Sequence, residues 1–248
     1  MMQIVQDILN WLNEIAPFST AESFDNVGLL IGENNCEVSD ILFCLDVTPD
    51  ILNTAKTMKA PLIIAHHPII FQGIKRLSFS TVQTECLTEI LKHKINVIGM
   101  HTNWDKAIGG VADSLAEILN LTDIKPLDEY ARMGKLPVPL SLSQFSKKVE
   151  NILNAPPRCY GNPEKIINTV VVGPGAYGEA VELAVNHNAD GFVVGEIHHH
   201  QILERKELCI LDAGHFATEW PGVQSLYNIY LQNKSFNTPA HLFIEKIY

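Results

Sequence analysis

The chain has 248 residues, of which 46% are hydrophobic and 19% are charged, and its formal net charge is −10. This composition is typical of a folded globular protein with room for one large domain or two smaller ones. The acidic balance disfavours broad nucleic-acid binding, and no uninterrupted apolar stretch approaches the length of a membrane span. We therefore expect neither a general nucleic-acid-binding protein nor a membrane protein.

The first residues place Asp7 and Glu14 among apolar residues at helical spacing, which predicts an amphipathic helix and not a signal peptide. The five cysteines are scattered along the chain and form no C-x-x-C pair. Together with the missing secretion signal, this pattern indicates reduced thiols and a cytoplasmic protein.

Strand-like apolar runs alternate with helix-like segments, which is typical of an α/β protein with mostly parallel sheets. The predicted strands are 41–46, 61–65, 95–100, 167–172, 191–195 and 208–212. The predicted helices are 3–15, 50–58, 83–93, 110–119, 143–153, 177–187 and 220–232. The segment 121–141 changes composition and contains three prolines, so we expect it to connect one lobe to another.

Two parts of the chain repeat one order of elements. Residues 41–69 and 167–202 both run strand, turn, helix, strand and then histidines, "AHHP" in the first part and "IHHHQ" in the second. The next strand of each part is followed by His-x-x-x-acid, in "HTNWD" and in "HFATE". This second parallel is more specific than the order of elements, and it predicts two similar lobes.

Histidines and acids therefore gather where strands end. In parallel α/β sheets, ligands bind beyond the carboxyl ends of the strands. Imidazoles and carboxylates without thiolates suit Zn, Mn, Fe, Ni or Co, with Mg possible if waters complete the shell. The side chains are too many for one catalytic ion and about right for two ions ~3.5–4 Å apart. The residues that we expect to converge are His66, His67, His101, Asp105, His215 and Glu219.

Two further motifs have competing interpretations. Gly173, Gly175 and Gly178 form a G-x-G-x-x-G between a strand and a helix, with Glu196 placed 18 residues later like the ribose-binding acid of a dinucleotide fold. A tight turn with close packing is the alternative, and the turn could still cradle a phosphate. The triplet 198–200 could supply a catalytic or outer-shell histidine such as His200, or form only a polar loop.

Several segments, in chain order, resemble the signatures of the Nif-three-like family. They are "AESFDNVGLLIG", "LDVTPDIL", "IIAHHPIIFQGIKRL", "HTNWDKAIGGVADSLAEIL", "GE" at 195–196 and "DAGHFATE". Bacterial members of that family are often labelled type 2 homologues of GTP cyclohydrolase I. The resemblance spans nearly the whole chain, which looks like the compact form without an inserted central domain. Where the family often has Trp-Asp-Asn, this chain has Phe24, Asp25 and Asn26.

The resemblance implies two similar, intertwined three-layer α/β lobes and a site for two divalent ions. We expect a first lobe at 1–125, with 220–248 packing back onto it, and a second lobe at 126–219. The resemblance also implies a toroidal homohexamer, and it assigns His101 to the outer shell or to proton transfer. The metal ligands that it implies are His66, His67, Asp105, His215 and Glu219.

The leading hypothesis is a dinuclear metal-dependent hydrolase that opens the purine ring of GTP or hydrolyses a related nucleotide or phosphoester. His101 or His200 would stabilise or protonate the leaving group. Lys75 or Arg76 could offer charge to a triphosphate, although both also fit a solvated loop. The alternative hypothesis is a metal-binding hexameric scaffold or regulator that acts through protein or DNA partners. A dehydrogenase that uses the glycine motif is the weaker option.

Overall fold

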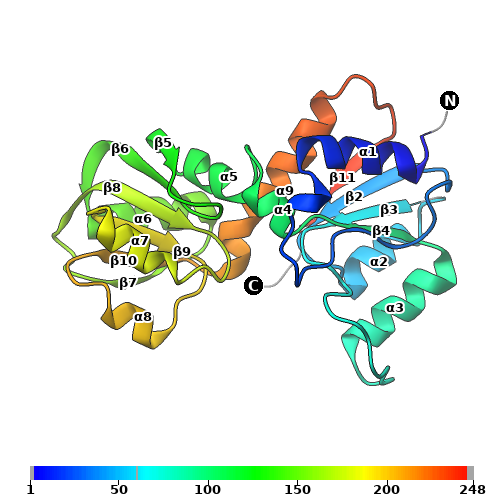
Figure 1. Ribbon diagram of the computed structural model, residues 1–248, viewed down its shortest axis with the longest axis horizontal. Coiled ribbons are helices and arrows are strands. Elements are labelled where there is room, and N and C mark those ends of the chain that lie inside the picture. The colour runs from blue at the N-terminus through cyan, green and yellow to red at the C-terminus, as the bar shows by residue number, and fades with distance from the viewer. Residues whose placement is uncertain (1–2, 60, 245–248) are drawn as a thin grey trace. The chain divides into compact units, whose positions relative to one another are not determined.

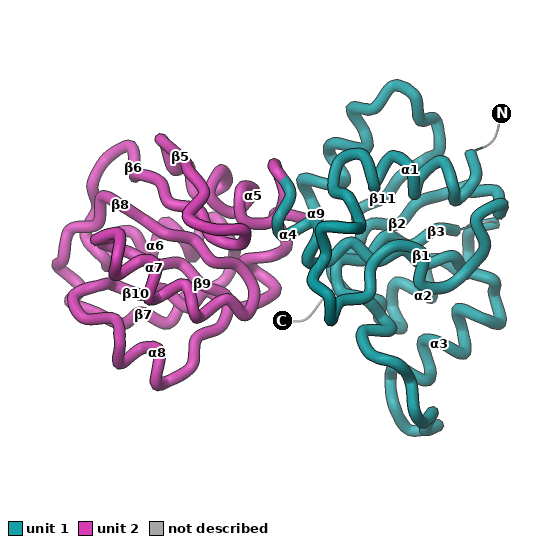
Figure 2. Tube along the Cα trace, viewed as in Figure 1, with its two compact units in different colours: residues 1–107, 223–248 teal, residues 108–222 magenta. Residues whose placement is uncertain are grey.

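The computed structural model describes residues 3–59 and 61–244, which form two compact units (Figures 1 and 2). Unit 1 comprises residues 1–107 and 223–248, and unit 2 comprises residues 108–222. The chain thus leaves unit 1, builds unit 2 and returns. Residues 1–2, 60 and 245–248, which the sequence analysis assigned to the first lobe, lie outside the described residues.

The sheet of unit 1 has the strand order β1-β4-β3-β2-β11. Strand β2 is parallel to β3 and β11, and β3 is parallel to β4, whereas β1 runs antiparallel to β4. The central strands are buried almost throughout, as parallel strands covered on both faces must be. The bounds are β1 (Gly28–Ile31), β2 (Asp40–Cys44), β3 (Pro61–Ala65), β4 (Asn96–Gly99) and β11 (Ala240–Leu242).

Helices cover both faces of this sheet. Leu42 of β2 packs with Ile51 of helix α2 on one face. The neighbouring residue Phe43 points to the other face, where its ring lies 5.7 Å from that of Tyr230 in α9, and Tyr230 lies 5.5 Å from Trp11 in α1. Unit 1 is therefore a three-layer α/β structure. Its helices are α1 (Val5–Ile15), η1 (Phe18–Thr20), α2 (Pro49–Ala55), α3 (Val82–His93), α4 (Thr102–Lys106) and the part of α9 (His215–Gln232) from Val223.

Unit 2 has a six-stranded sheet in the order β5-β6-β8-β9-β10-β7. Its centre, β8-β9-β10, is parallel, while β5, β6 and β7 add antiparallel pairings on the two sides. The strands are β5 (Thr122–Pro126), β6 (Arg132–Ser141), β7 (Arg158–Tyr160), β8 (Ile166–Gly173), β9 (Gly191–Val194) and β10 (Cys209–Asp212).

Alternate residues of β8 face different helices of unit 2. Val170 and Val172 lie in one apolar cluster with Phe145 of α6 and Leu115 of α5. Val171 lies in a second cluster, with residues of α7. Unit 2 is also three-layered, so the predicted two-lobe α/β class is confirmed. The helices are α5 (Val111–Ile118), α6 (Leu142–Leu153), α7 (Ala180–Asn186) and α8 (His199–Leu203), with the start of α9.

Every predicted strand and helix is present, with ends that differ by a few residues. The prediction that 121–141 connects the lobes is wrong, because these residues form the antiparallel pair β5 and β6. Pro137 and Pro139 lie where the pairing of β6 with β8 shifts register, between Lys135 and Leu140, so they remove no bond from a regular ladder. The boundary between the units falls before α5 and not at residues 125–126, since α5 packs on β6 and β8 of unit 2.

The repeat seen in the sequence is a repeat of structure. In unit 1, β2, α2, β3, α3 and β4 follow one another, and in unit 2, β8, α7, β9, α8 and β10 do so (Figure 1). In both units the three strands are adjacent and parallel. Within residues 3–59 and 61–244, no helix combines the length and apolar character that crossing a membrane requires.

Candidate metal centre

Three imidazoles converge at the carboxyl ends of β3 and β4 in unit 1. His66 and His67 follow β3 directly, and their backbone amides donate to the carbonyls of Cys44 and Leu45 at 3.1 and 2.9 Å. His101 follows β4 and precedes α4. Each of the three histidines offers a ring nitrogen, and these atoms all lie within 4.8 Å of one another. The ends of two parallel strands thus hold three potential metal ligands together.

Asp105 joins this cluster from α4. The spacing of four residues brings it back one helical turn toward His101, and its Oδ1 lies 3.5 Å from Nε2 of His66. The side chains of both partners are largely shielded from solvent. Unit 1 therefore assembles the two adjacent histidines, the third histidine and the acid that the sequence analysis selected there.

Each of the three rings is held through its Nδ1 atom. Nδ1 of His66 lies 2.8 Å from the carbonyl oxygen of Met100, and Nδ1 of His67 lies 2.8 Å from a carboxylate oxygen of Asp46. Nδ1 of His101 lies 2.9 Å from Oδ1 of Asp25. A carbonyl or an ionised carboxylate only accepts, so Nδ1 carries the proton and donates it. Neutral rings then present the Nε2 lone pair, which is the form that binds metal.

Asp25 is a buried carboxylate whose partners keep it ionised. Burial by itself raises its pKa, but the hydrogen bond from His101 and the hydrogen bonds from the hydroxyl and amide of Thr102 hold the pKa well below its usual value. The side chain of Asp25 is fully buried. His101 is therefore fixed in position by a permanent negative charge.

Unit 2 places a similar arrangement at the carboxyl ends of β9 and β10. Helix α9 begins at His215, and Nε2 of His215 lies 2.9 Å from Oε2 of Glu219, one turn further along the helix. Nδ1 of His215 lies 2.9 Å from Oε1 of Glu196, which follows β9. His215 is thus oriented by an acid as His67 and His101 are, and its Nε2 faces the almost fully buried carboxylate of Glu219.

The glycine motif supports this helix. The amide of Gly175 donates to Oγ1 of Thr218 at 3.1 Å, and the carbonyl of Gly175 accepts from the amide of Glu196 at 2.8 Å. Gly175 has φ +60°, and a Cβ atom there would overlap the carboxylate of Glu219. The turn therefore packs beneath Glu219 and Glu196, which is the close-packing interpretation of the motif.

We expect Gly175→Ala to lower the free energy of unfolding by about 2–4 kcal/mol, as measured by chemical denaturation. A left-handed conformation costs an L-residue about 1 kcal/mol, and overlap in a packed site adds about 1–3 kcal/mol. Gly109→Ala is the matched control, because Gly109 has φ +74° but no atom within 4 Å of a built Cβ. It should lose only about 1 kcal/mol. Equal losses would show that Glu219 does not restrict this turn.

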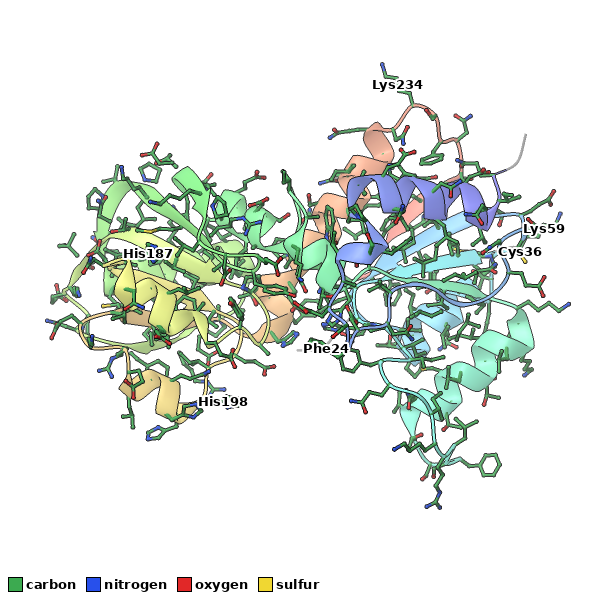
Figure 3. All side chains as sticks on the ribbon, viewed as in Figure 1. Phe24, Cys36, Lys59, His187, His198 and Lys234 are labelled. Carbon is green, nitrogen blue, oxygen red and sulfur yellow. The ribbon has the colours of Figure 1, made fainter. Side chains whose placement is uncertain are left out.

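The structure places the other two selected residues outside these clusters. His200 lies in the short helix α8, where its ring stacks on that of His198 at 5.7 Å (Figure 3 labels His198). Lys75 lies in the loop between β3 and α3 of unit 1 and lines a hollow there. Within residues 3–59 and 61–244, neither side chain forms a hydrogen bond or an ion pair with another residue.

Sequence reasoning missed the acids that orient the rings. Asp46 follows β2 in unit 1 and Glu196 follows β9 in unit 2, so both lie two residues past the end of a parallel strand, although β2 and β9 are not matching strands of the repeat. This position was the available signal for them. The sequence places Glu196 like a ribose-binding acid and within the "GE" signature, and its bond to Nδ1 of His215 gives it a different role. The imidazole nitrogens and carboxylate oxygens fit a divalent transition metal, and His66, His67 and His101 could hold such an ion.

Over residues 3–246 the chain matches the family described as Duf34/NIF3 (NGG1p interacting factor 3). The chain belongs to this family, which confirms the resemblance found in the sequence. A protein of Clostridium perfringens named "GTP cyclohydrolase 1 type 2 homolog" is 33% identical over 233 residues, which cover 88% of this chain and 87% of that protein. A Streptomyces coelicolor protein of the same name is 31% identical over 236 residues, which cover 89% of this chain and 83% of that protein.

Two solved structures share the fold of this chain. The Staphylococcus aureus hypothetical protein SA1388 superposes with a TM-score of 0.92 at 26% identity, covering 99% of this chain and 97% of that one. A Bacillus cereus protein related to NIF3 has a TM-score of 0.91 at 20% identity, covering 99% and 98%. The second likeness shows the fold alone.

Proposed function

We propose that the protein is a dinuclear metal-dependent hydrolase that acts on GTP or a related nucleotide. The observation that carries this proposal is that four histidines, two of them adjacent, each bind an acceptor through Nδ1. Such bonds fix the ring and its tautomer as metal-binding histidines require. The name "GTP cyclohydrolase 1 type 2 homolog", carried by two relatives that align with most of the chain, supports the substrate class.

The proposed ligands offer three neutral nitrogens and two carboxylates. Asp105 and Glu219 would each offer a carboxylate with two oxygens. When bound, two such ions acidify water and polarise an electrophile. The five proposed ligands are His66, His67, Asp105, His215 and Glu219.

His101 is the proposed proton carrier. Its Nδ1–H bond to the ionised Asp25 stabilises an imidazolium if Nε2 takes up a proton, and it keeps the ring in place when that proton is passed to a leaving group. His200 and Lys75 stay predictions, as a second proton carrier and as a contact for a phosphate. We also propose a cytoplasmic toroidal homohexamer, as the family resemblance implies.

Metal analysis and a substrate screen together test the proposal. Protein purified without chelators should contain about two divalent ions per chain. The loaded protein should hydrolyse one member of a panel of nucleotides, phosphoesters and oligonucleotides. A metal content near zero that does not rise on adding Mn²⁺ or Zn²⁺ would refute the dinuclear site. A full metal content without turnover of any member would refute the hydrolase.

A metal-binding scaffold or regulator is the second candidate. The family description itself names an interaction with a protein, NGG1p. This candidate requires partner binding that does not depend on turnover. Tight, salt-sensitive DNA binding, or binding of a protein partner, that persists in Glu219→Gln would favour it.

A further inference from the structure

Two large aromatic side chains are exposed beside the histidine cluster of unit 1. Phe24 is 65% exposed and Phe71 is 38% exposed. Their rings lie 6.2 Å apart at 69°, and the ring of Phe71 lies 5.8 Å from that of His101 at 86°. Phenyl rings are normally buried, and a pair left open at a polar site provides a surface on which a planar ligand can stack.

The loop that follows β3 forms a hollow next to this pair. The hollow has a volume of about 480 Å³, which lies in the range of sites for small molecules. The side-chain amide of Gln83, in α3, donates to the carbonyl of Ile69 at 2.8 Å and ties the loop to the helix. Phe71 belongs to both features, since it lines the hollow and contacts His101.

Two cations line the same hollow. They are Lys75 and Arg76, and neither forms an ion pair with any residue in the described ranges 3–59 and 61–244. In a chain with a formal net charge of −10, two adjacent cations without a carboxylate partner are well suited to an anion. An aromatic surface at one end and a cationic hollow at the other match a nucleoside phosphate.

We infer that this region is the nucleotide subsite of the proposed enzyme and that it fixes the direction of the nucleotide. The base stacks on Phe71 and Phe24, and the phosphates lie in the hollow at Lys75 and Arg76. The ring of the base, not the phosphate chain, therefore faces His101. This inference rests on the proposed function and refines it, because it favours attack on the base over cleavage of a phosphoester.

Calorimetric titration of the full chain tests the inference, with guanosine, GTP and inorganic triphosphate as probes and a chelator present. Phe71→Leu should weaken the binding of guanosine and of GTP by about tenfold or more, because it removes the stacking surface. The affinity for triphosphate should not change. The double variant Lys75→Gln with Arg76→Gln should weaken the binding of GTP and of triphosphate by at least about tenfold. Its affinity for guanosine should not change. The inference is overturned if Phe71→Leu weakens the binding of triphosphate and the double variant weakens that of guanosine, or if neither change alters any affinity.

Matched variants separate binding from general damage. Phe79→Leu changes a fully exposed phenyl ring of the same loop that does not line the hollow. Lys59→Gln with Lys92→Gln removes the same charge elsewhere in unit 1, and Lys59 lies at the far end of this unit from Phe24 (Figure 3). Both controls should bind as the unchanged protein does. If Phe71→Leu alters the oligomeric state but not the affinity for any of the three probes, the aromatic pair forms an interface between subunits and the inference fails.

The two proposals fail in different ways. Binding with the expected selectivity in a protein that takes up no metal would keep the subsite and refute the hydrolase. Suppose instead that metal-dependent turnover of GTP is the same in Phe71→Leu, in Lys75→Gln with Arg76→Gln and in the unchanged protein. This result would support the hydrolase and refute the subsite.

Discussion

Glu219→Gln is expected to lower metal-dependent hydrolysis by about 10³-fold, measured as kcat/KM on the substrate that the screen identifies. The change keeps the size of the side chain and removes the negative charge that would hold an ion. Loss of several kcal/mol of charge stabilisation in the transition state corresponds to this factor, since each 1.36 kcal/mol is tenfold. Metal content per chain should fall together with activity.

The fold should survive this change. The amide of glutamine can donate a hydrogen bond to Nε2 of His215 at the position where Glu219 faces that ring, and it adds no volume against the turn at Gly175. Glu182→Gln, at an exposed position of α7 in the same unit, is the matched control and should retain metal and activity. A Glu219→Gln protein with normal metal content and normal turnover would remove Glu219 from the proposed site.

Removing the metal is expected to abolish hydrolysis. It should also lower the free energy of unfolding by about 4 kcal/mol for each ion whose free concentration had been about 1,000 times its dissociation constant. An ion that binds the folded chain and not the unfolded chain would add its binding energy to the stability of the fold. Urea unfolding with and without a chelator measures the difference, and adding the ion back should restore both properties.

The His67→Ala variant provides the internal control for this experiment. It lacks one proposed ligand, so its unfolding midpoint should shift less on chelation than that of the unchanged protein. If the unfolding midpoint of the unchanged protein does not respond to the chelator, no ion is bound in the folded chain.

The strands and the histidines at their ends could be predicted because their signals are local. Runs such as Pro61–Ala65 are apolar throughout, and residues that end parallel strands lie at one edge of a sheet. The spacing of His215 and Glu219 predicted their contact for the same reason, since four residues make about one turn.

The supporting acids could not be predicted in this way, because each depends on contacts between distant parts of the chain. Asp25 is 76 residues from His101, and Asp46 is 21 residues from His67. No local pattern joins these pairs, and only the packed sheet brings them together. The sequence also did not predict the pair β5 and β6. Pro137 and Pro139 suggested a connection between lobes, but they lie where the hydrogen-bond ladder between β6 and β8 is irregular.

The Nδ1 bonds of the histidines also have a consequence for how an ion would be exchanged. Rings held by Met100, Asp46, Asp25 and Glu196 have already lost their rotational freedom, so capturing an ion orders few side chains and costs little entropy. The chain stripped of metal should therefore keep these ring orientations. Reloading should then be fast and should proceed without a refolding step.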